Sequence, residues 1–403
     1  MLFPLLAPEA RVLFLTATDS SRDSELLSLV RGNLDWLELC RLAEREKALS
    51  PLWRRLDSVV GIEVPDEPKA HLNRLARVTS FHMSYLEQLV ISSTARLDRA
   101  NIDYTLLKGA ALACAAYGSF GERPMVDVDL LVRETDVDRA VDALLSAGWT
   151  WPADKPRDQD FSHLHHLPAL IDPNGLVSAE VHTTILPHAA PFGITTDEIL
   201  ASARSVDFRG TKVRVPDPLY MLLHASIHFA WSHLFRTGAW RTFRDVQKMT
   251  DTFSLDWNAF IELARDHRAG TCCYWTLHLA QELIGAKIPK EVLTELCPPL
   301  PSLVLRALER HFVLILTPSG TPCPSVTLRR VMWRAGIMPD RSGHANARPW
   351  EVLALRPEDR QRREKSSNAR EPQRRVRQIT REWMSYWSGV LLSAPSDRLS
   401  AKS

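Results

Sequence analysis

The sequence of 403 residues lacks several features that would place it in a specialised class of protein. It contains no run of about 18 uncharged apolar residues, which excludes an ordinary membrane-spanning helix. It also lacks an excess of one charge, because 50 lysines and arginines stand against 48 aspartates and glutamates. This balance argues against a protein that coats nucleic acid by bulk charge. The hydrophobic content of 45% is that of an ordinary globular protein and excludes wholesale disorder.

Cysteines are few and show no pairing pattern. No two are spaced as C-x-x-C, so the sequence indicates neither a zinc framework nor a disulfide scaffold. Buried, reduced thiols are expected instead, as in a cytoplasmic protein. In residues 1–23 no basic residue precedes the first apolar stretch, which is not the pattern of a signal peptide. The six cysteines are Cys40, Cys114, Cys272, Cys273, Cys297 and Cys323.

Both flanks of the chain have the apolar periodicity of helices. Residues 24–88 carry a stripe with a period of about 3.6 residues, and a long helix is predicted from about 69 to 101 because no glycine or proline interrupts it. We therefore predict a helical N-terminal region over 1–101 and a helical C-terminal domain over 216–350. The helices predicted in the second region cover 219–231, 240–250, 257–266 and 272–284.

One segment of the N-terminal flank recurs in the C-terminal flank. Leu34, Asp35 and Trp36 are repeated as Leu255, Asp256 and Trp257, and the leucines and alanines that follow have the same offsets. Two interpretations stay open. Both segments can be amphipathic helices that an aspartate caps and a tryptophan anchors, or the two can be copies of one helical unit.

Residues 102–215 have a different pattern, which predicts a small α/β domain. A strand ending near Lys108 is followed by a turn at Gly109 and an alanine-rich helix. A β-branched strand and a helix capped by Thr135 or Asp136 come next, and the turn sequence at 172–175 predicts a hairpin. The predicted fold class is therefore α+β or α/β, with a small mixed-sheet domain flanked by helical regions.

The C-terminal residues 351–403 are predicted to form a basic helix or linker and a tail. Between Arg356 and Arg381 there are ten lysines and arginines against four acidic residues. A solvated helix face is the favoured interpretation. Peripheral membrane contact with the help of Trp383 and Trp387 stays open, and so does nucleic-acid binding. Residues past Ser393 are expected to be disordered.

Asp127 and Asp129 are the strongest candidates for a site with chemistry. They stand two apart in an apolar strand, so both side chains project from one face roughly 6.5–7 Å apart. Two ionised carboxylates in such surroundings repel each other unless a cation lies between them. Oxygen ligands favour Mg²⁺ or Mn²⁺ as that cation. A D-x-D pair alone is also common on exposed strands.

Two further groups extend this candidate site. Glu180 and His182 share one face of a later strand, which could deliver a third carboxylate to the aspartates. A strand that ends at a glycine and opens a helix presents backbone N–H groups that suit a phosphate. The candidate nucleotide-binding residues are Lys108, Gly109, Ala110, Arg123 and His182.

The order of these pieces resembles a known superfamily. The segments LLKGAAL at 106–112 and GERPMVDVDLLV at 121–132, followed by EVH at 180–182, are similar to DNA-polymerase-β-like nucleotidyltransferases. The closest similarity is to uncharacterised bacterial proteins of that superfamily with the pattern LLKG-x-AL, R-x-x-x-D-x-D-L-L-V and E-x-H. The resemblance is specific over 104–132, extends to 186 and is loose in the helical flanks.

This resemblance implies roles for the candidate residues. Asp127 and Asp129 would bind Mg²⁺ (or Mn²⁺), and Glu180 would complete a second metal site and help to activate an acceptor hydroxyl. Gly109 and Ala110 would cradle the triphosphate. Two departures from the superfamily are Ala110, which lacks the hydroxyl of the usual serine, and a longer spacing between the glycine and the first aspartate.

The resemblance also implies an activity: Mg²⁺-dependent transfer of a nucleoside monophosphate, for example from ATP, to an unidentified hydroxyl with release of pyrophosphate. A small-molecule, peptide or protein acceptor is favoured over nucleic acid because the bulk charge is balanced. The alternatives are a nucleotide-binding regulatory protein without turnover, or a nucleic-acid or partner-binding adaptor that acts through its helical flanks and basic tail.

Several histidines and charged residues outside these motifs are also candidate site residues. A zinc site at the histidines has no further ligand with recognisable spacing, and His224 and His228 are expected to line a cleft. Arg241, Arg244 and Asp245 are candidates for contacts with nucleotide or acceptor, although an intramolecular ion pair among them is favoured. The histidines in question are His163, His165, His166, His224 and His228.

Overall fold

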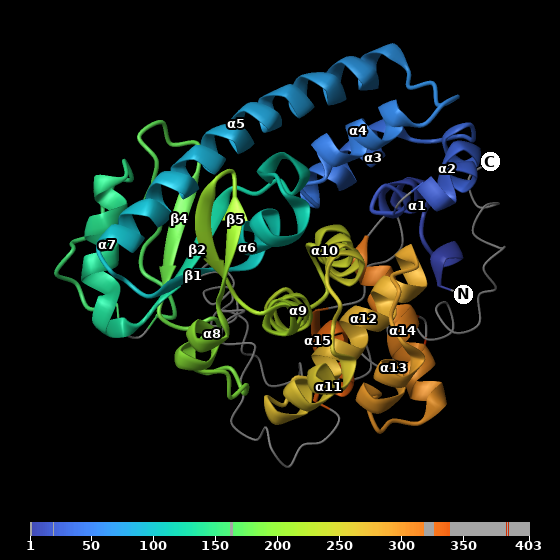
Figure 1. The fold of residues 1–403 in the computed structure, drawn as a ribbon. Coiled ribbons are helices and arrows are strands. Elements are labelled where there is room, and N and C mark those ends of the chain that lie inside the picture. Colours follow the sequence, from blue (N-terminus) through green and yellow to red (C-terminus); the bar gives the residue numbers. More distant parts are fainter. Residues whose placement is uncertain are drawn as a thin grey trace, which may run out of the picture.

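A four-stranded mixed sheet lies on one side of a largely helical chain (Figure 1). The computed structural model describes residues 2–18, 20–161, 164–317 and 326–338, together with Met384 and Tyr386. Its mixed α and β content, with a small mixed sheet, confirms the predicted class. Within this described part, no helix combines the length and apolarity needed to cross a membrane.

The strands of the sheet have the order β1-β2-β4-β3. β2 pairs antiparallel with β1 and parallel with β4, and β4 pairs antiparallel with β3. β2 is therefore central, in agreement with its apolar sequence. The bounds are β1 Tyr104–Leu106, β2 Asp127–Val132, β3 Leu170–Ile171 and β4 Ser178–His182. β3 and β4 form the predicted hairpin, where Gly175 has a φ of 67° and Asp172 accepts bonds from the backbone of the turn.

A second, two-stranded sheet was not predicted. β5 (Arg204–Phe208) and β6 (Thr211–Val215) form an antiparallel hairpin. Its turn needs positive φ at two successive residues, which are Arg209 at 55° and Gly210 at 77°. Arginine is an unusual residue for the first of these positions, where asparagine or aspartate is the common signal. The turn therefore escaped prediction from sequence.

Shorter helices connect the strands of the two sheets. The predicted cap of α7 is wrong in detail, because Asp136 stands before the helix but makes no capping bond and binds Arg139 instead. The bounds are α6 Lys108–Leu112, the π-helix η3 Ala113–Tyr117, the 3₁₀-helices η4 Phe120–Glu122 and η5 Glu134–Asp136, α7 Val137–Ser146 and α8 Thr196–Ser202.

The N-terminal helices extend along the sheet through the long helix α5 (Figure 1). α5 spans Asp66–Arg99, close to the predicted 69–101, and contacts α4 and α7. Tyr85 of α5 donates a hydrogen bond of 3.1 Å to Asp172 in the hairpin turn, which ties helix and sheet together. The preceding elements are η1 Phe3–Leu5, α1 Pro8–Leu15, η2 Ser20–Arg22, α2 Asp23–Val30, α3 Trp36–Arg45 and α4 Leu49–Ser58.

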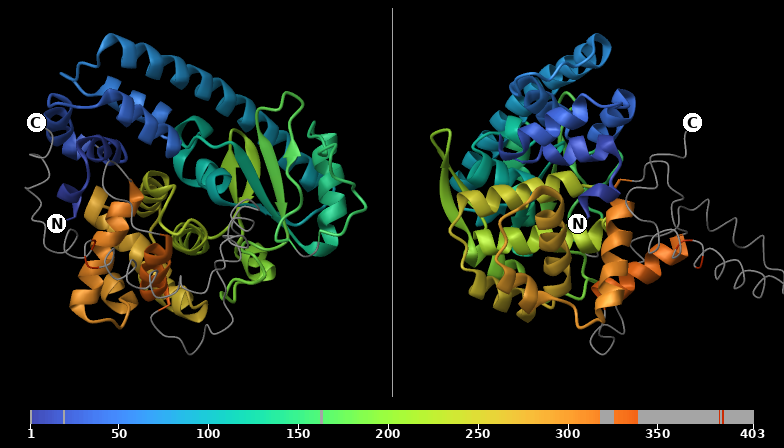
Figure 2. Two further views of the ribbon diagram at one scale, coloured as in Figure 1. Left: turned by 180° about the vertical axis from the view of Figure 1, so that it is seen from behind. Right: turned by 90° about the vertical axis from the view of Figure 1, so that its right-hand side faces the viewer.

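The C-terminal helices match the four predicted ranges closely and form the part of the molecule below α10 in Figure 1. Figure 2 shows the same group from behind and from the side, against the sheet region. The bounds are α9 Pro218–Ile227, the π-helix η6 His228–Ser232, α10 Ala239–Thr252, α11 Trp257–Asp266, α12 Gly270–Ile284, α13 Lys290–Leu296, α14 Ser302–Leu316 and α15 Val326–Ile337.

The repeated sequence segment forms the same local structure twice. Asp35 caps α3 and Asp256 caps α11, each through a side-chain oxygen 3.0 Å from a backbone N–H. The turns to α4 and α12 both place a residue in the left-handed region, Lys47 with φ 57° and Arg268 with φ 56°. Capping alone does not require this shared turn, which favours the interpretation as one helical unit present twice.

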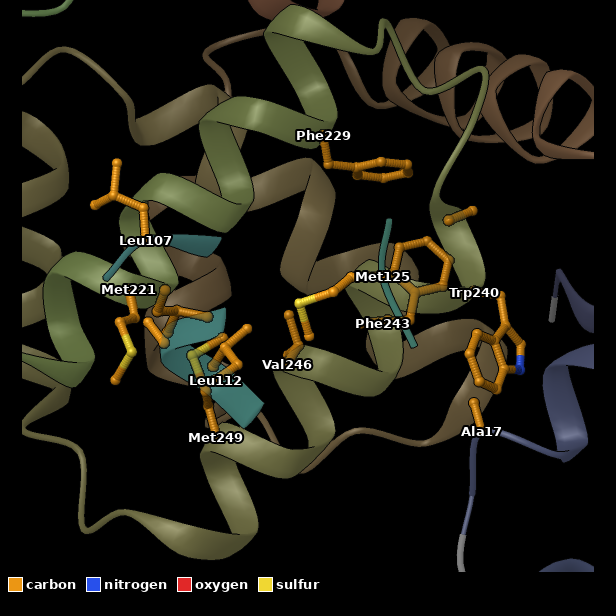
Figure 3. Packing of buried hydrophobic residues seen from close by; sticks show 14 of the residues in the cluster. Ala17, Leu107, Leu112, Met125, Met221, Phe229, Trp240, Phe243, Val246 and Met249 are labelled. Carbon is orange, nitrogen blue, oxygen red and sulfur yellow. The ribbon is translucent and has the colours of Figure 1, made fainter. Parts of the chain in front are cut away.

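One hydrophobic core runs through the sheet region and both helical flanks. Figure 3 shows Leu107 and Leu112 beside Met221 of α9 and Met249 of α10, with Trp240 near Ala17 of the N-terminal region. Apolar side chains thus connect the N-terminal region, the sheet region and the C-terminal helices. The predicted division at residues 101, 215 and 350 stays a prediction.

Candidate functional site

A cavity of about 220 Å³ lies between the sheet and the C-terminal helices. Its walls come from the start of β2, the start of α6, one face of α9 and η6, and the first turns of α10. Asp127, Asp129, Lys108, His228 and Arg241 all line it. Residues more than 100 positions apart in the sequence therefore meet around one space.

Two of the carboxylates predicted from sequence line this cavity, and the third lies beside one of them. Asp127 and Asp129 both line it from β2, as two residues on one face of a strand should. β4 runs parallel to β2 with Glu180 directly beside Asp129 in the register. The strand pairing thus brings a third carboxylate next to the aspartates.

Two nitrogen-bearing side chains hold Asp129 in place. Lys108 Nζ lies 2.6 Å from Asp129 Oδ1, and His182 Nε2 lies 2.8 Å from the same oxygen. His182 Nε2 also lies 3.4 Å from Glu180 Oε2. His182, predicted among the nucleotide-binding residues, is thus placed between two of the carboxylates.

The protonation of these groups follows from their contacts. Burial alone would raise the pKa of Asp129, but Lys108 and His182 outweigh it and hold that pKa well below its usual range. Burial, and after it the Asp129 carboxylate, raises the pKa of Asp127. The hydrogen bond with His182 lowers the pKa of Glu180. Burial opposes a charged His182, yet its bonds to Asp129 and Glu180 raise its pKa.

This group of side chains fits a divalent cation. Ligand atoms of Asp129, Glu180 and His182 lie within 4.8 Å of one another, and no other such group occurs among the described residues. His182 Nδ1 is buried without a hydrogen-bond partner, so no bond at this second ring nitrogen fixes the orientation of the imidazole. The ammonium of Lys108 already occupies a cation's position beside Asp129. Carboxylate oxygens suit Mg²⁺ or Mn²⁺, and an imidazole nitrogen suits Mn²⁺ better than Mg²⁺.

The turn before α6 differs from the prediction. The strand ends at Leu106, and the left-handed residue is Lys108 with φ 45°, not Gly109. The glycine is needed for another reason. A Cβ at position 109 would lie 3.3 Å from both Arg123 Nη1 and Met125 Sδ. The first backbone N–H groups of α6, including those of Gly109 and Ala110, have no partner within the helix.

Arg123 is engaged in a buried ion pair. Its Nε and Nη2 donate bonds of 2.7 and 2.8 Å to the two oxygens of Asp245, and Tyr117 Oη donates a third bond of 2.8 Å to Asp245 Oδ1. The ion pair expected in this region therefore exists, but the partner of Asp245 is Arg123. Arg123 still lines the cavity, where its guanidinium is fully committed to protein groups.

The two arginines of α10 have different surroundings. Arg244 Nη2 lies 3.1 Å from Glu122 Oε2, and its guanidinium covers the rings of Tyr117 and Trp240. Arg241 lines the cavity and, among the described residues, has no hydrogen-bond or ion-pair partner. Burial, and then the neighbouring Arg123, lowers the pKa of Arg241. Arg241 is the cation of this helix that an anion in the cavity could bind.

Histidines line the wall of α9 and η6, as expected for His224 and His228. His233, which sequence reasoning missed, joins them with its ring 4.4 Å from that of His228. Burial lowers the pKa of His224 to about 3 and that of His233 to about 4, so both rings are neutral at pH 7. Tyr220 was also missed, although its spacing of four residues from His224 is a signal for one helix face.

Some of the remaining predicted residues adjoin the site, and others are not described. His165 and His166 lie edge to face with each other and beside His182, with ring centroids 5.5 and 5.1 Å from its ring, while His163 lies outside the described residues. Also outside are Cys323 and the basic segment 356–381 with Trp383 and Trp387. The other five cysteines are free thiols, as expected, and four of them are buried.

Comparison with known proteins connects this geometry to a family. The model of a family described as uncharacterised nucleotidyltransferases matches residues 32–285, more than half of the chain. This range contains the carboxylates, the Lys108 turn and the histidine wall. A search of curated proteins gave no match.

Proposed function

The chain belongs to this uncharacterised nucleotidyltransferase family, and from that membership we propose that it transfers a nucleoside monophosphate from a nucleoside triphosphate to an acceptor hydroxyl. The acceptor oxygen forms a bond to the α-phosphorus, the bond to the bridging oxygen breaks, and pyrophosphate leaves. The hydroxyl proton passes to a carboxylate of the site. We infer the wider DNA-polymerase-β-like superfamily from the D-x-D strand beside the glycine turn.

The observation that carries this proposal is the register of β2 and β4. It puts Glu180 beside Asp129, which lines the cavity together with Asp127. Three carboxylates this close repel one another and are costly to bury. Such a cluster is typical of a site that holds Mg²⁺ or Mn²⁺. Asp127, Asp129 and Glu180 would hold it, and the cation would stabilise negative charge on the reacting phosphate.

Other side chains support the same reaction. Lys108 and His182 keep Asp129 ionised, as its lowered pKa shows. Lys108 and Arg241 place positive charge on the cavity wall, and the free N–H groups at Gly109 and Ala110 can bind phosphate oxygens. Arg123 contributes indirectly, because its bonds to Asp245 fix α10 and with it Arg241.

The proposal also includes the kind of molecule that provides the acceptor hydroxyl. A small molecule, or a hydroxyl of a peptide or protein that enters the cavity, is favoured over a nucleic acid. The cavity volume of about 220 Å³ and the balanced charge of the chain support this choice.

The test is thermal stability with each of the four ribonucleoside triphosphates, with and without Mg²⁺. A ligand at 100 times its Kd adds roughly 2.7 kcal/mol to the free energy of unfolding, which shifts the midpoint visibly. We expect a Mg²⁺-dependent shift that Asp127→Asn with Asp129→Asn abolishes and that the surface control Asp57→Asn retains. No shift with any nucleotide would refute the proposal. A shift without pyrophosphate release from the nucleotide, whatever acceptor is added, would point to a nucleotide-binding regulator.

A further inference from the structure

One wall of the cavity carries a row of aromatic side chains. Tyr220, His224 and His228 are spaced four residues apart along α9 and η6, so they share one helix face, and all three line the cavity. Eight residues of helix span about 12 Å. The row is therefore about as long as an extended nucleotide without its last phosphates.

The side chains at the two ends of the row differ in polarity. Beyond His228 lies His233, with ring centroids 4.4 Å apart, and His233 is followed by the unpaired Arg241. At the Tyr220 end the cavity is lined instead by the apolar side chains of Ile199 and Met221. One end suits phosphate and the other suits a flat, uncharged group.

His224 offers a hydrogen-bond acceptor within this row. Its Nε2 is buried and has no partner, while the ring hydrogen-bonds to the backbone of Ile185. Because Nε2 is unpartnered, the bond to Ile185 uses Nδ1, and it favours a proton on that nitrogen. In the neutral ring Nε2 then carries a lone pair and can accept a bond from an N–H group.

Asp127 and Asp129 line the same cavity as the row. The charge of Asp129 acts on the pKa of both His224 and His228, whereas Arg241 acts on the pKa of Asp127. Arg241 and Tyr220 with His224 line the same cavity as the carboxylates, so a triphosphate whose α-phosphate lies at the carboxylates has room to extend toward Arg241 or toward Tyr220.

We propose that Tyr220, His224 and the neighbouring apolar side chains form the subsite for the base of the nucleotide, with His224 Nε2 accepting a hydrogen bond from a base N–H. The inference rests on the proposed nucleotidyltransferase function. A base is favoured over a polyhydroxyl acceptor because this end combines aromatic faces and apolar side chains with few polar atoms, among them Tyr220 Oη and His224 Nε2. The phosphates point the other way, toward Arg241.

The experiment separates the base from the phosphates. Binding of inorganic tripolyphosphate and of non-hydrolysable analogues of the four ribonucleoside triphosphates is measured calorimetrically with Mg²⁺. His224→Leu should weaken the best nucleotide about tenfold and leave tripolyphosphate unchanged. His224→Gln, whose amide oxygen can accept the bond, should weaken it less. Arg241→Gln should weaken both ligands about tenfold. The exposed His71→Leu and Arg74→Gln are the matched controls.

Each result distinguishes the two proposals. If neither nucleotide nor tripolyphosphate binds the wild type, the proposed function fails, and the base subsite fails with it. If nucleotide binds the wild type and His224→Leu equally, or if His224→Leu weakens tripolyphosphate as strongly, only the base subsite is wrong. Should His224→Leu lose its circular-dichroism signal, Tyr220→Leu takes its place, with the same loss expected for nucleotide alone.

Discussion

Asp129 and Asp245 are two aspartates in the walls of one cavity, with exposed fractions of 3% and 4%. Asp245 receives three hydrogen bonds, two from one guanidinium and one from Tyr117. Asp129 receives bonds from Lys108 and His182, both at Oδ1, and has two further carboxylates close by. The two aspartates are thus equally buried, but Asp245 has a balanced charge partner whereas Asp129 lies among further negative charges.

The comparison separates two uses of a buried carboxylate. Around Asp245 one negative charge meets one positive charge in bidentate geometry, which is the arrangement that makes a buried pair tolerable. Asp129, in contrast, has two further carboxylates beside it, those of Asp127 and Glu180. The ammonium of Lys108 and the imidazole of His182 do not neutralise all three carboxylates. We expect removal of Asp245 to affect folding and removal of Asp129 to affect activity.

The largest effect is expected from Asp129→Asn on activity. Asparagine keeps the shape of the side chain but loses the charge that would hold a cation, so pyrophosphate release should fall about a thousandfold or more. The rate is measured with saturating nucleotide, and circular dichroism checks that the fold persists. A rate within tenfold of the wild type would contradict the assignment of Asp129.

Asp245→Ala should cost the most stability. It leaves the buried guanidinium of Arg123 without its partner, and the free energy of unfolding in urea should fall by about 3–5 kcal/mol. Replacing the pair together, Asp245→Leu with Arg123→Met, should recover most of this loss. A fall below 1 kcal/mol for the single variant would show that the pair is not structural.

Removal of the divalent cation should have a smaller effect on stability. At about 100 times the Kd, Mg²⁺ or Mn²⁺ adds roughly 2.7 kcal/mol to the free energy of unfolding, which EDTA should remove. The Asp245→Leu, Arg123→Met variant should respond like the wild type, whereas Asp127→Asn with Asp129→Asn should not respond. An equal response in all three would place the cation elsewhere.

The smallest effect is expected from Asp127→Asn in the absence of divalent cations. Burial, followed by Asp129, raises the pKa of Asp127, so the folded protein is destabilised as pH rises from the ordinary aspartate pKa through the raised one. Asparagine removes this penalty. The variant should therefore be more stable than the wild type at pH 7, by about 0.5–2 kcal/mol, and equal to it below about pH 4. Urea unfolding at both pH values tests the sign, and a less stable variant at pH 7 would contradict it.

Local signals in the sequence predicted much of the fold. α11 begins and ends where predicted because Asp256 caps it and the chain turns sharply at Arg268. The hairpin of β3 and β4 follows from the turn residues at 172–175, whose aspartate binds three backbone N–H groups. Such signals act within a few residues and need no knowledge of the rest of the chain.

Long-range pairing escaped prediction. Asp245 lies 122 positions from Arg123, and no local pattern selects it over the neighbouring charged residues. The two π-helical turns, η3 and η6, also have no local signal, although η6 lines the cavity through His228. The sequence showed the spacing of Asp127 and Asp129, the presence of Glu180 and Arg241 as a candidate contact. It did not show that Arg241 has no ion-pair partner among the described residues.

Gly109 lies where the two arrangements of charge meet. Its missing side chain leaves 3.3 Å between the position of a Cβ and both Arg123 Nη1 and Met125 Sδ. An alanine at 109 would therefore require the end of the Arg123 or Met125 side chain to shift by a few tenths of an ångström. A shift of Arg123 would act on its bonds to Asp245, so a change of one methyl group at the cavity wall would be felt in the stabilising ion pair.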